Sequence, residues 1–170
     1  MKQQNEQEIG LNSTLFIYSS SHLSGSNKVR FFYALKGRDD KLGLIKETNS
    51  RFLAKSVILA PASKTELWRS FFKFWGCKFR QVSLSSAQAT HNLFVYNTSH
   101  MKSSQLVNFF YAFKGRGKKA GILAKVKGEL LAKSVVLVPA LAAKELENFF
   151  MAWKCRFQKL EVSIRKIKDE

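Results

Sequence analysis

Apolar and polar residues alternate along positions 29–36, a short segment rich in aromatic side chains. Alternation with a period of two is typical of a strand that buries one of its faces. The face predicted to be buried carries Val29, Phe31, Tyr33 and Leu35, and the opposite face carries Arg30, Phe32 and Lys36. We therefore predict a strand here, and a hairpin turn at the following "GRDD", because glycine and aspartate favour tight turns.

Three further strands and one helix are predicted around this segment. Residues 15–19 form an aromatic and β-branched run, residues 42–46 return from the predicted turn, and residues 53–60 end at a proline. The spacing then changes to that of an amphipathic helix over residues 63–79, since large side chains recur every three or four positions. A short alternating run at residues 81–84 predicts one more strand after the helix.

The whole pattern occurs twice in the chain. Residues 15–84 align with residues 93–162 without a gap, and 29 of the 70 aligned positions are identical. "VRFFYALKGR" aligns with "VNFFYAFKGR", and "LAKSVILAPA" aligns with "LAKSVVLVPA". The second copy also ends in an alternating run, residues 159–164. We conclude that the chain contains a tandem duplication.

These elements predict an α+β fold with the order β-β-β-β-α in each repeat, in which one helix covers a curved antiparallel sheet. A single copy would bury little apolar surface by itself, so we expect the repeats to pack as one pseudo-two-fold unit. We predict a flexible N-terminus at residues 1–14, a first repeat at residues 15–84 and a linker at residues 85–92. A second repeat at residues 93–164 and a C-terminal tail at residues 165–170 follow.

The charge balance suggests a class of partner. The 170 residues include 29 Lys and Arg against 12 Asp and Glu, which gives a formal net charge of +17. A folded surface with this excess attracts polyanions, of which nucleic acid is the commonest. The sequence has no apolar run long enough to span a membrane and no secretory signal at its N-terminus. Its two cysteines do not form a disulfide framework, so we expect an intracellular protein of the cytoplasm, the nucleus or an organelle matrix.

The sheet face that the helix leaves uncovered would present an aromatic ring between cations. Bases stack on such rings and phosphates contact the cations, as in proteins that bind single-stranded nucleic acid. The candidate nucleic-acid-binding residues are Arg30, Phe32, Lys36, Arg38, Lys41 and Lys55, and in the second repeat Asn108, Phe110, Lys114, Arg116, Lys119 and Lys133. Two alternatives remain open. In the first, both faces of the strand are buried, and Phe32 and Phe110 fill the second face. In the second, Lys55 and Lys133 of the two "LAKSV" segments protect an exposed strand edge from pairing with another chain.

Metal binding and catalysis have little support in the sequence. Two histidines and two cysteines match across the repeat, namely His22, His100, Cys77 and Cys155, but no closely spaced pair of ligands accompanies them. No acidic residue recurs in register, and no nucleophile motif or phosphate-binding loop is present. The sequence therefore predicts no metal site, no cofactor and no enzymatic activity.

Four strands followed by a helix, in tandem, resemble the PUR-repeat proteins, whose wider architecture the Whirly family and the kinetoplastid guide-RNA-binding proteins share. The matching segments are "FFYALKGR" and "FFYAFKGR", then "KLGLIKE" and "KAGILAK", a fourth strand ending in proline, and a helix rich in Phe and Trp. The resemblance covers about residues 14–164. "KGRGKKAG" is similar to a Whirly segment, whereas "KGRDDKLG" departs from it, and the acidic residues typical of PUR strands are missing.

The resemblance implies an intramolecular pair of repeats that binds single-stranded DNA or RNA on its sheet face and self-associates as dimers. The sequence thus favours a single-stranded nucleic-acid-binding protein acting in transcription, replication or RNA metabolism. One alternative is a structural RNA-binding component of a ribonucleoprotein, such as an organellar ribosome or an RNA-editing complex. A second is a basic scaffold or membrane-surface protein, which the lack of a strongly amphipathic basic helix disfavours.

Overall fold

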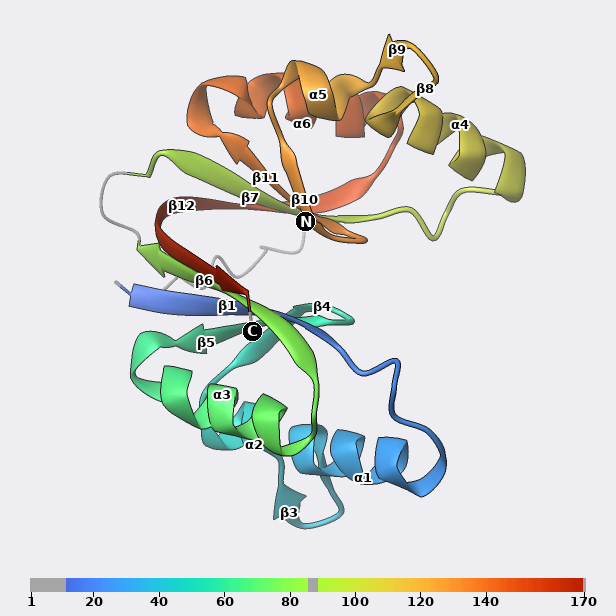
Figure 1. Cartoon of the computed structure of the whole chain (residues 1–170). Coiled ribbons are helices and arrows are strands. Elements are labelled where there is room, and N and C mark those ends of the chain that lie inside the picture. The colour runs from blue at the N-terminus through green and yellow to red at the C-terminus, as the bar shows by residue number, and fades with distance from the viewer. Residues whose placement is uncertain (1–11, 86–88, 170) are drawn as a thin grey trace, which may run out of the picture. The chain divides into compact units, whose positions relative to one another are not determined.

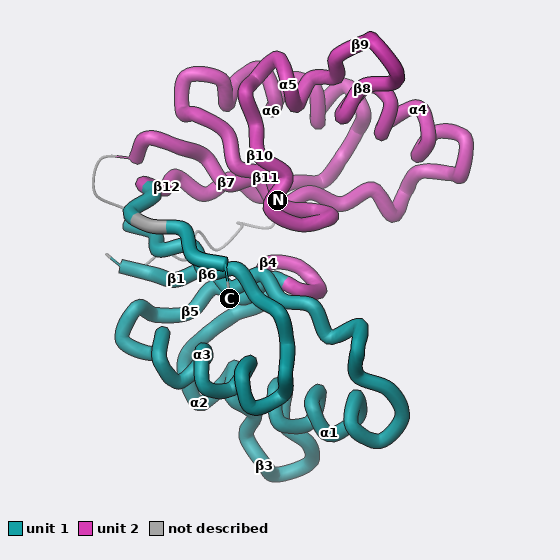
Figure 2. Tube along the Cα trace, viewed as in Figure 1, with its two compact units in different colours: residues 1–52, 57–87, 164–170 teal, residues 53–56, 88–163 magenta. Residues whose placement is uncertain are grey.

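The computed structural model describes residues 12–85 and 89–169, whose helices and strands are shown in Figure 1. These residues divide into two compact units (Figure 2). Unit 1 comprises residues 12–52, 57–85 and 164–169, and unit 2 comprises residues 53–56 and 89–163.

The predicted ends and linker fall partly outside this description. Of the predicted N-terminal segment, residues 1–11 lie outside the described residues, and residues 12–14 belong to the first strand. Of the predicted linker, residues 86–88 lie outside them as well. The predicted C-terminal tail continues the last strand as far as Asp169.

Unit 1 begins with a strand that is followed directly by a helix. The helix α1 (Gly25–Lys36) ends where Gly37 takes a φ of 88°, a conformation that glycine adopts without the clash a Cβ would cause. The elements of the first half of the chain around α1 are β1 (Asn12–Ser19), β2 (Gly37–Arg38), β3 (Lys41–Leu42), α2 (Leu44–Glu47), β4 (Arg51–Ala54), β5 (Val57–Pro61), a 3-10 turn (Ala62–Lys64), α3 (Thr65–Phe74) and β6 (Lys78–Ser85).

The second half of the chain repeats the same order of elements. They are β7 (His91–Asn97), α4 (Ser103–Lys114), β8 (Gly115–Arg116), β9 (Lys119–Ala120), α5 (Ile122–Lys125), β10 (Glu129–Ala132), β11 (Val135–Pro139), a 3-10 turn (Ala140–Ala142), α6 (Ala143–Ala152) and β12 (Arg156–Asp169). The two similar halves confirm the predicted internal repeat.

Each half of the chain contributes four neighbouring strands and packs its helices on one side of them. The strand order is β6-β1-β5-β4 in the first half and β12-β7-β11-β10 in the second. β1 runs antiparallel to β5 and β6, and β7 runs antiparallel to β11 and β12. Apart from the short hairpins and the one-turn helices α2 and α5, the order is β-α-β-β-α-β, the ferredoxin-like arrangement. Figure 1 shows α1 and α3 on the same side of β1, and α4 and α6 on the same side of β7.

The helix-facing side of each sheet forms an aromatic core. In unit 1, Phe16 and Tyr18 of β1 pack on Phe72 of α3, with ring centres 5.7 and 5.0 Å away. In unit 2, Tyr96 stacks on Phe150 at 4.9 Å. Aromatic side chains bury a large apolar area each, so these clusters contribute much of the stability of both units.

The opposite side of each sheet is apolar and buried as well. Leu15 pairs with Leu59 and Val82 in register, and all three are nearly inaccessible to solvent. Leu93 and Leu137 hold the corresponding places in unit 2. The prediction of a sheet with one open face is therefore wrong, because strands buried on both faces carry apolar residues at consecutive positions.

The predicted class is confirmed, since the fold is α+β with antiparallel sheets and two similar halves. The predicted β-β-β-β-α order is wrong, because residues 29–36 lie in α1 and residues 44–47 form α2. The helix predicted over residues 63–79 is present as α3, and the strand predicted at residues 81–84 is present within β6. The order on which the resemblance to PUR-repeat and Whirly proteins rests is not that of this chain.

Candidate functional site

The exposed side of α1 carries a tyrosine that is covered by an arginine. Phe31 and Leu35, four positions apart, are buried against the core, and this turns Tyr33 toward solvent. Tyr33 is 42% exposed, and the guanidinium carbon of Arg38 lies 4.7 Å from the centre of its ring. At this distance the cation is attracted by the electron-rich face of the ring.

Unit 2 reproduces this contact on α4. Tyr111 is 41% exposed, and the guanidinium carbon of Arg116 lies 4.6 Å from its ring centre. Phe109 and Phe113 are the buried residues that orient this helix. The same stacked pair therefore occurs on the surface of both units with nearly the same exposure and distance.

A second cation lies beside each stacked pair. The ammonium nitrogen of Lys36 lies 5.6 Å from the ring centre of Phe32 and 5.4 Å from that of Phe52. In unit 2, the ammonium nitrogen of Lys114 lies 5.5 Å from the ring centre of Phe110. Phe32 and Phe110 are half-buried and pack on the core of their own unit. Each ammonium group therefore lies over a ring that the core holds in place, and the lysine remains exposed.

A short hairpin holds the arginine and one more lysine at the end of the helix. Arg38 of β2 pairs with Lys41 of β3, and both side chains are exposed. The base of the hairpin is closed by two glycines in close approach: a Cβ on Gly43 would lie within 2.1 Å of the nitrogen of Gly37. Any side chain at Gly43 would force these backbones apart, so the hairpin is fixed against the helix end. Arg116 and Lys119 are held by Gly115 and Gly121 in the same way.

We name the two groups of side chains after the unit to which they belong. Surface 1 consists of Arg30, Phe32, Tyr33, Lys36, Arg38 and Lys41, and surface 2 consists of Asn108, Phe110, Tyr111, Lys114, Arg116 and Lys119. Each surface joins the outer side of one helix to the hairpin that follows it. Ten of the twelve candidate residues predicted from the sequence lie on these two surfaces, though on helices and hairpins and not on a strand face.

The other two predicted residues lie elsewhere in the fold. Lys55 and Lys133 lie in the turns that join β4 to β5 and β10 to β11. Both residues are exposed. The main-chain oxygen of Lys133 accepts a hydrogen bond from the hydroxyl of Tyr96 at 2.9 Å, so this turn is anchored to the core.

The sequence prediction missed the most distinctive residues of the site. It placed Val29 and Tyr33 in the core together with Phe31, but only Phe31 is buried. The available signal was the helical spacing of Phe31 and Leu35, repeated as Phe109 and Phe113. Under that period, residues 33 and 111 face outward.

The two hairpins differ in charge. Hairpin 1 reads "GRDDKLG" and hairpin 2 reads "GRGKKAG". Asp39 lies 3.2 Å from Arg38 and partly neutralises it, although both side chains are largely exposed to water. No acidic residue occurs in hairpin 2, so hairpin 2 is the more positive of the two hairpins.

The matched histidines each contact a main-chain oxygen, and the matched cysteines are buried. The Nε2 atoms of His22 and His100 lie 3.0 and 3.2 Å from the main-chain oxygens of Trp75 and Trp153, at the ends of α3 and α6. Within residues 12–85 and 89–169, no group of three or more His, Cys, Asp or Glu side chains is placed to hold a metal ion. Burial raises the pKa of the Cys77 thiol and raises that of Cys155 to about 11, so both remain protonated at neutral pH.

No protein-family model and no curated protein sequence matches this chain. In the part of the chain that the structure describes, no helix is both long enough and apolar enough to cross a membrane. Interpretation of the two surfaces therefore rests on their geometry and charge.

Proposed function

We propose that this chain binds single-stranded nucleic acid through surface 1 and surface 2. The observation that carries the proposal is the arginine stacked on an exposed tyrosine, which occurs at the same place in both units at 4.7 and 4.6 Å. The net charge of +17 favours the approach of any polyanion to these surfaces.

The chemistry of each surface suits a flexible strand with splayed bases. A nucleobase can stack on the tyrosine ring or on the flat guanidinium plane, and stacking of this kind contributes roughly 1–3 kcal/mol per base. The neighbouring lysines and the hairpin arginine can donate hydrogen bonds to phosphate oxygens, and arginine can do so in a bidentate way. A duplex hides its base faces, so the aromatic part of the surface favours single strands.

The proposal does not rely on an open sheet. Many RNA-binding domains stack bases on aromatic residues of a four-stranded sheet, but here both sheet faces are apolar and buried. The helix–hairpin surfaces take that role in our proposal. The resemblance to PUR-repeat or Whirly proteins adds no support, because it depended on a β-β-β-β-α order of elements that this chain does not have.

Fluorescence anisotropy with labelled single-stranded RNA, single-stranded DNA and a duplex of equal length tests the proposal. We expect tighter binding of the single strands, and an affinity that falls steeply with salt because phosphate contacts release counterions. The double substitution Tyr33→Ala with Tyr111→Ala should weaken binding at least tenfold even at high salt, whereas Tyr33→Phe with Tyr111→Phe should retain most of it.

A charge-matched control separates specific contacts from general attraction. Arg38→Gln with Arg116→Gln is compared with Lys78→Gln and Arg156→Gln, which remove the same charge from the exposed first residues of β6 and β12. We expect a greater loss from the hairpin pair. Equal losses from both pairs, together with tyrosine-to-alanine variants that bind normally, would refute the proposal.

A further inference from the structure

Surface 1 and surface 2 differ at only one of their six positions. The two aromatic residues, the two lysines and the hairpin arginine of surface 1 all recur in surface 2. The remaining position holds Arg30 in surface 1 and Asn108 in surface 2. The side chains suited to stacking and to phosphate contacts are therefore the same in both units, whereas one polar side chain is exchanged for another.

The exchanged residue lies one helical turn before the stacked tyrosine. Arg30 and Tyr33 are three positions apart within α1, and Asn108 and Tyr111 are three positions apart within α4. Residues at this spacing are neighbours on one side of a helix, with about 5–6 Å between their Cβ atoms. Side chains on a helix point toward its N-terminus, so each tyrosine ring lies over the turn that carries the exchanged residue. Arg30 and Asn108 are exposed, as the tyrosines are.

A base that stacks at the tyrosine can present its edge to the exchanged residue. The guanidinium of Arg38 covers one face of the Tyr33 ring, and that of Arg116 covers one face of the Tyr111 ring. A base can therefore stack on the other face of the ring or on the outer plane of the guanidinium. Stacking uses only the flat face of a base, so its hydrogen-bonding edges stay open. A polar side chain one turn away on the same side of the helix can reach such an edge.

Arginine and asparagine recognise different purines. A guanidinium donates two hydrogen bonds to guanine, at O6 and N7, which are both acceptors. A carboxamide donates to N7 of adenine and accepts from its N6 amino group. Phosphate binding does not account for an exchange of these two residues, because asparagine has no charge to offer a phosphate. What the two side chains share is a bidentate fit to the edge of a purine.

We propose that the two surfaces read different bases of a single strand. Surface 1 selects guanine through Arg30, and surface 2 selects adenine through Asn108. This inference rests on the proposed function and adds a base preference to each surface. Arg30 and Asn108 determine specificity, while the residues common to both surfaces supply affinity for any strand. The purine edges are the same in RNA and DNA, so the preference applies to both.

Variants with one intact surface test each preference separately. Tyr33→Ala with Arg38→Gln leaves only surface 2 intact, and Tyr111→Ala with Arg116→Gln leaves only surface 1 intact. Each variant is titrated by fluorescence anisotropy with labelled oligouridine strands that carry one central adenine or one central guanine, and with their DNA counterparts. We expect surface 2 to bind the adenine strand about fivefold more tightly than the guanine strand, and surface 1 to show the opposite preference by a similar factor.

Exchanging the two residues should exchange the preferences. Asn108→Arg in the variant with only surface 2 should turn its preference from adenine to guanine, and Arg30→Asn in the variant with only surface 1 should do the reverse. Asn148→Arg is the matched control, because it adds the same charge at an exposed position of α6 and should leave the adenine preference unchanged. Arg30→Lys keeps the charge but lacks the planar fork, so the guanine preference should be lost while the salt dependence of binding stays the same.

Two outcomes would overturn this inference and leave the proposed function in place. In one, each surface binds its strands equally well whichever base they carry, so that Arg30 contacts only phosphate. In the other, a base preference exists but survives both exchanges, so that other residues read the base. Loss of binding to every strand by the wild type would refute the proposed function, and base reading with it. The substituted residues are all exposed, and circular dichroism of each variant checks that the fold is intact.

Discussion

Unit 1 and unit 2 share the stacked side chains of surface 1 and surface 2, but they differ in one part of their cores. The stacked pairs Tyr33–Arg38 and Tyr111–Arg116 have nearly the same geometry. In its core, unit 1 buries a polar network in which Trp68 Nε1 donates to Ser50 Oγ at 3.0 Å and Ser50 contacts Thr48 at 2.7 Å. In unit 2 the three corresponding residues are Leu146, Gly128 and Val126.

This difference teaches that buried residues and exposed residues are under separate constraints, since packing governs the first and folding does not govern the second. A core can be filled by a satisfied polar network or by apolar side chains of suitable volume, and either solution supports the fold. Exposed side chains contribute little to stability and are free to diverge without affecting folding. Tyr33, Lys36 and Arg38 nevertheless recur in unit 2, and our proposal attributes this recurrence to binding.

The largest expected effect is on stability and comes from removing the indole of Trp68 in unit 1. Trp68→Ala should reduce the free energy of unfolding by about 3–5 kcal/mol, because it leaves a large cavity and deprives Ser50 of its donor. Leu146→Ala, the equivalent change in unit 2, should cost less because a smaller side chain with no polar contact is lost. Urea denaturation followed by circular dichroism measures both. A cost below about 1 kcal/mol for Trp68→Ala would contradict the tight packing described.

Exchanging the hairpin charges should have the next largest effect, on binding. Asp39→Gly with Asp40→Lys gives hairpin 1 the charges of hairpin 2, and should raise the affinity for single-stranded RNA roughly tenfold at low salt with a steeper salt dependence. The backbone tolerates the exchange, since Asp39 and Gly117 have similar φ values of 52° and 57°. The reverse exchange, Gly117→Asp with Lys118→Asp, should lower the affinity. An unchanged affinity in both variants would show that the hairpins do not contact the ligand.

Removing one hydroxyl tests the polar network itself. Ser50→Ala leaves the Trp68 N–H without its buried acceptor, whereas the Thr48 hydroxyl still donates to the main-chain oxygen of Leu44; the variant should destabilise the protein by about 1–3 kcal/mol. The comparison is Gly128→Ser in unit 2, which should also destabilise, but through collision, because a Cβ there would lie 2.8 Å from Leu123 Cδ1. Thermal unfolding of both variants and of the wild type gives the result. A neutral Ser50→Ala would mean that the network adds no stability.

The smallest effect concerns pH. The pKa of Glu147 is lowered below its ordinary value of 4.5 by the hydrogen bond from Lys159, so its ion pairs stabilise the fold above that pH and are lost as the pH falls through the lowered value. Glu147→Gln should therefore cost up to about 1 kcal/mol at pH 7 and almost nothing at pH 2. Glu66→Gln, in the more exposed pair with Arg69 in unit 1, is the control and should change less. Urea titrations at the two pH values measure the difference.

How much of the fold could be predicted from the sequence depends on how many residues each pattern of apolar side chains covers. The helix α3 was predicted because five large apolar residues recur over three turns, and only a helix places them together. The duplication, the α+β class and the strands β1 and β6 also followed from the sequence. In each of these helices and strands, the spacing of the apolar residues fits only one kind of secondary structure.

The failure at α1 has a physical cause. Over eight residues, Phe31 and Leu35 satisfy the period of a helix, while Val29, Phe31, Tyr33 and Leu35 satisfy the period of a strand. The first turn of the helix, residues 25–28, consists of Gly, Ser, Asn and Lys, a composition typical of loops. Packing against α3 decides in favour of the helix, since Phe31 contacts Phe71 and Trp75, and contacts between distant residues leave no trace in a single sequence.

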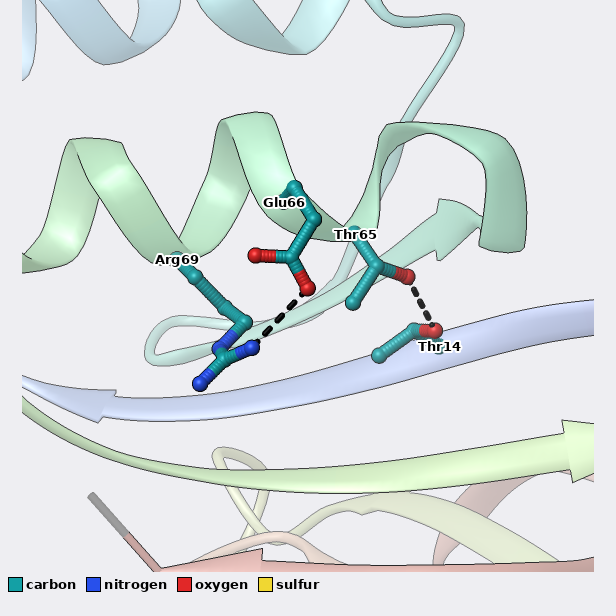
Figure 3. A network of polar contacts seen from close by, with 4 residues as sticks. All are labelled: Thr14, Thr65, Glu66 and Arg69. Carbon is teal, nitrogen blue, oxygen red and sulfur yellow. Dashed lines mark hydrogen bonds and ion pairs between the residues drawn. The ribbon is translucent and has the colours of Figure 1, made fainter.

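The hydroxyl contact between Thr14 and Thr65 in unit 1 could not have been predicted for a similar reason. The two residues are 51 positions apart in the chain, but their hydroxyl oxygens lie 2.8 Å apart in the fold (Figure 3). Each residue is ordinary in sequence, and only the fold brings the two side chains together.

The two buried cysteines provide a reporter that needs no engineering. Each unit contains one thiol at the same structural position, Cys77 after α3 and Cys155 after α6, and both are less than a tenth exposed. A maleimide can modify either one only when the surrounding helix and strand separate. Mass spectrometry of the modified peptides would therefore record the opening rate of each half of the molecule in a single sample, in the presence or absence of any ligand.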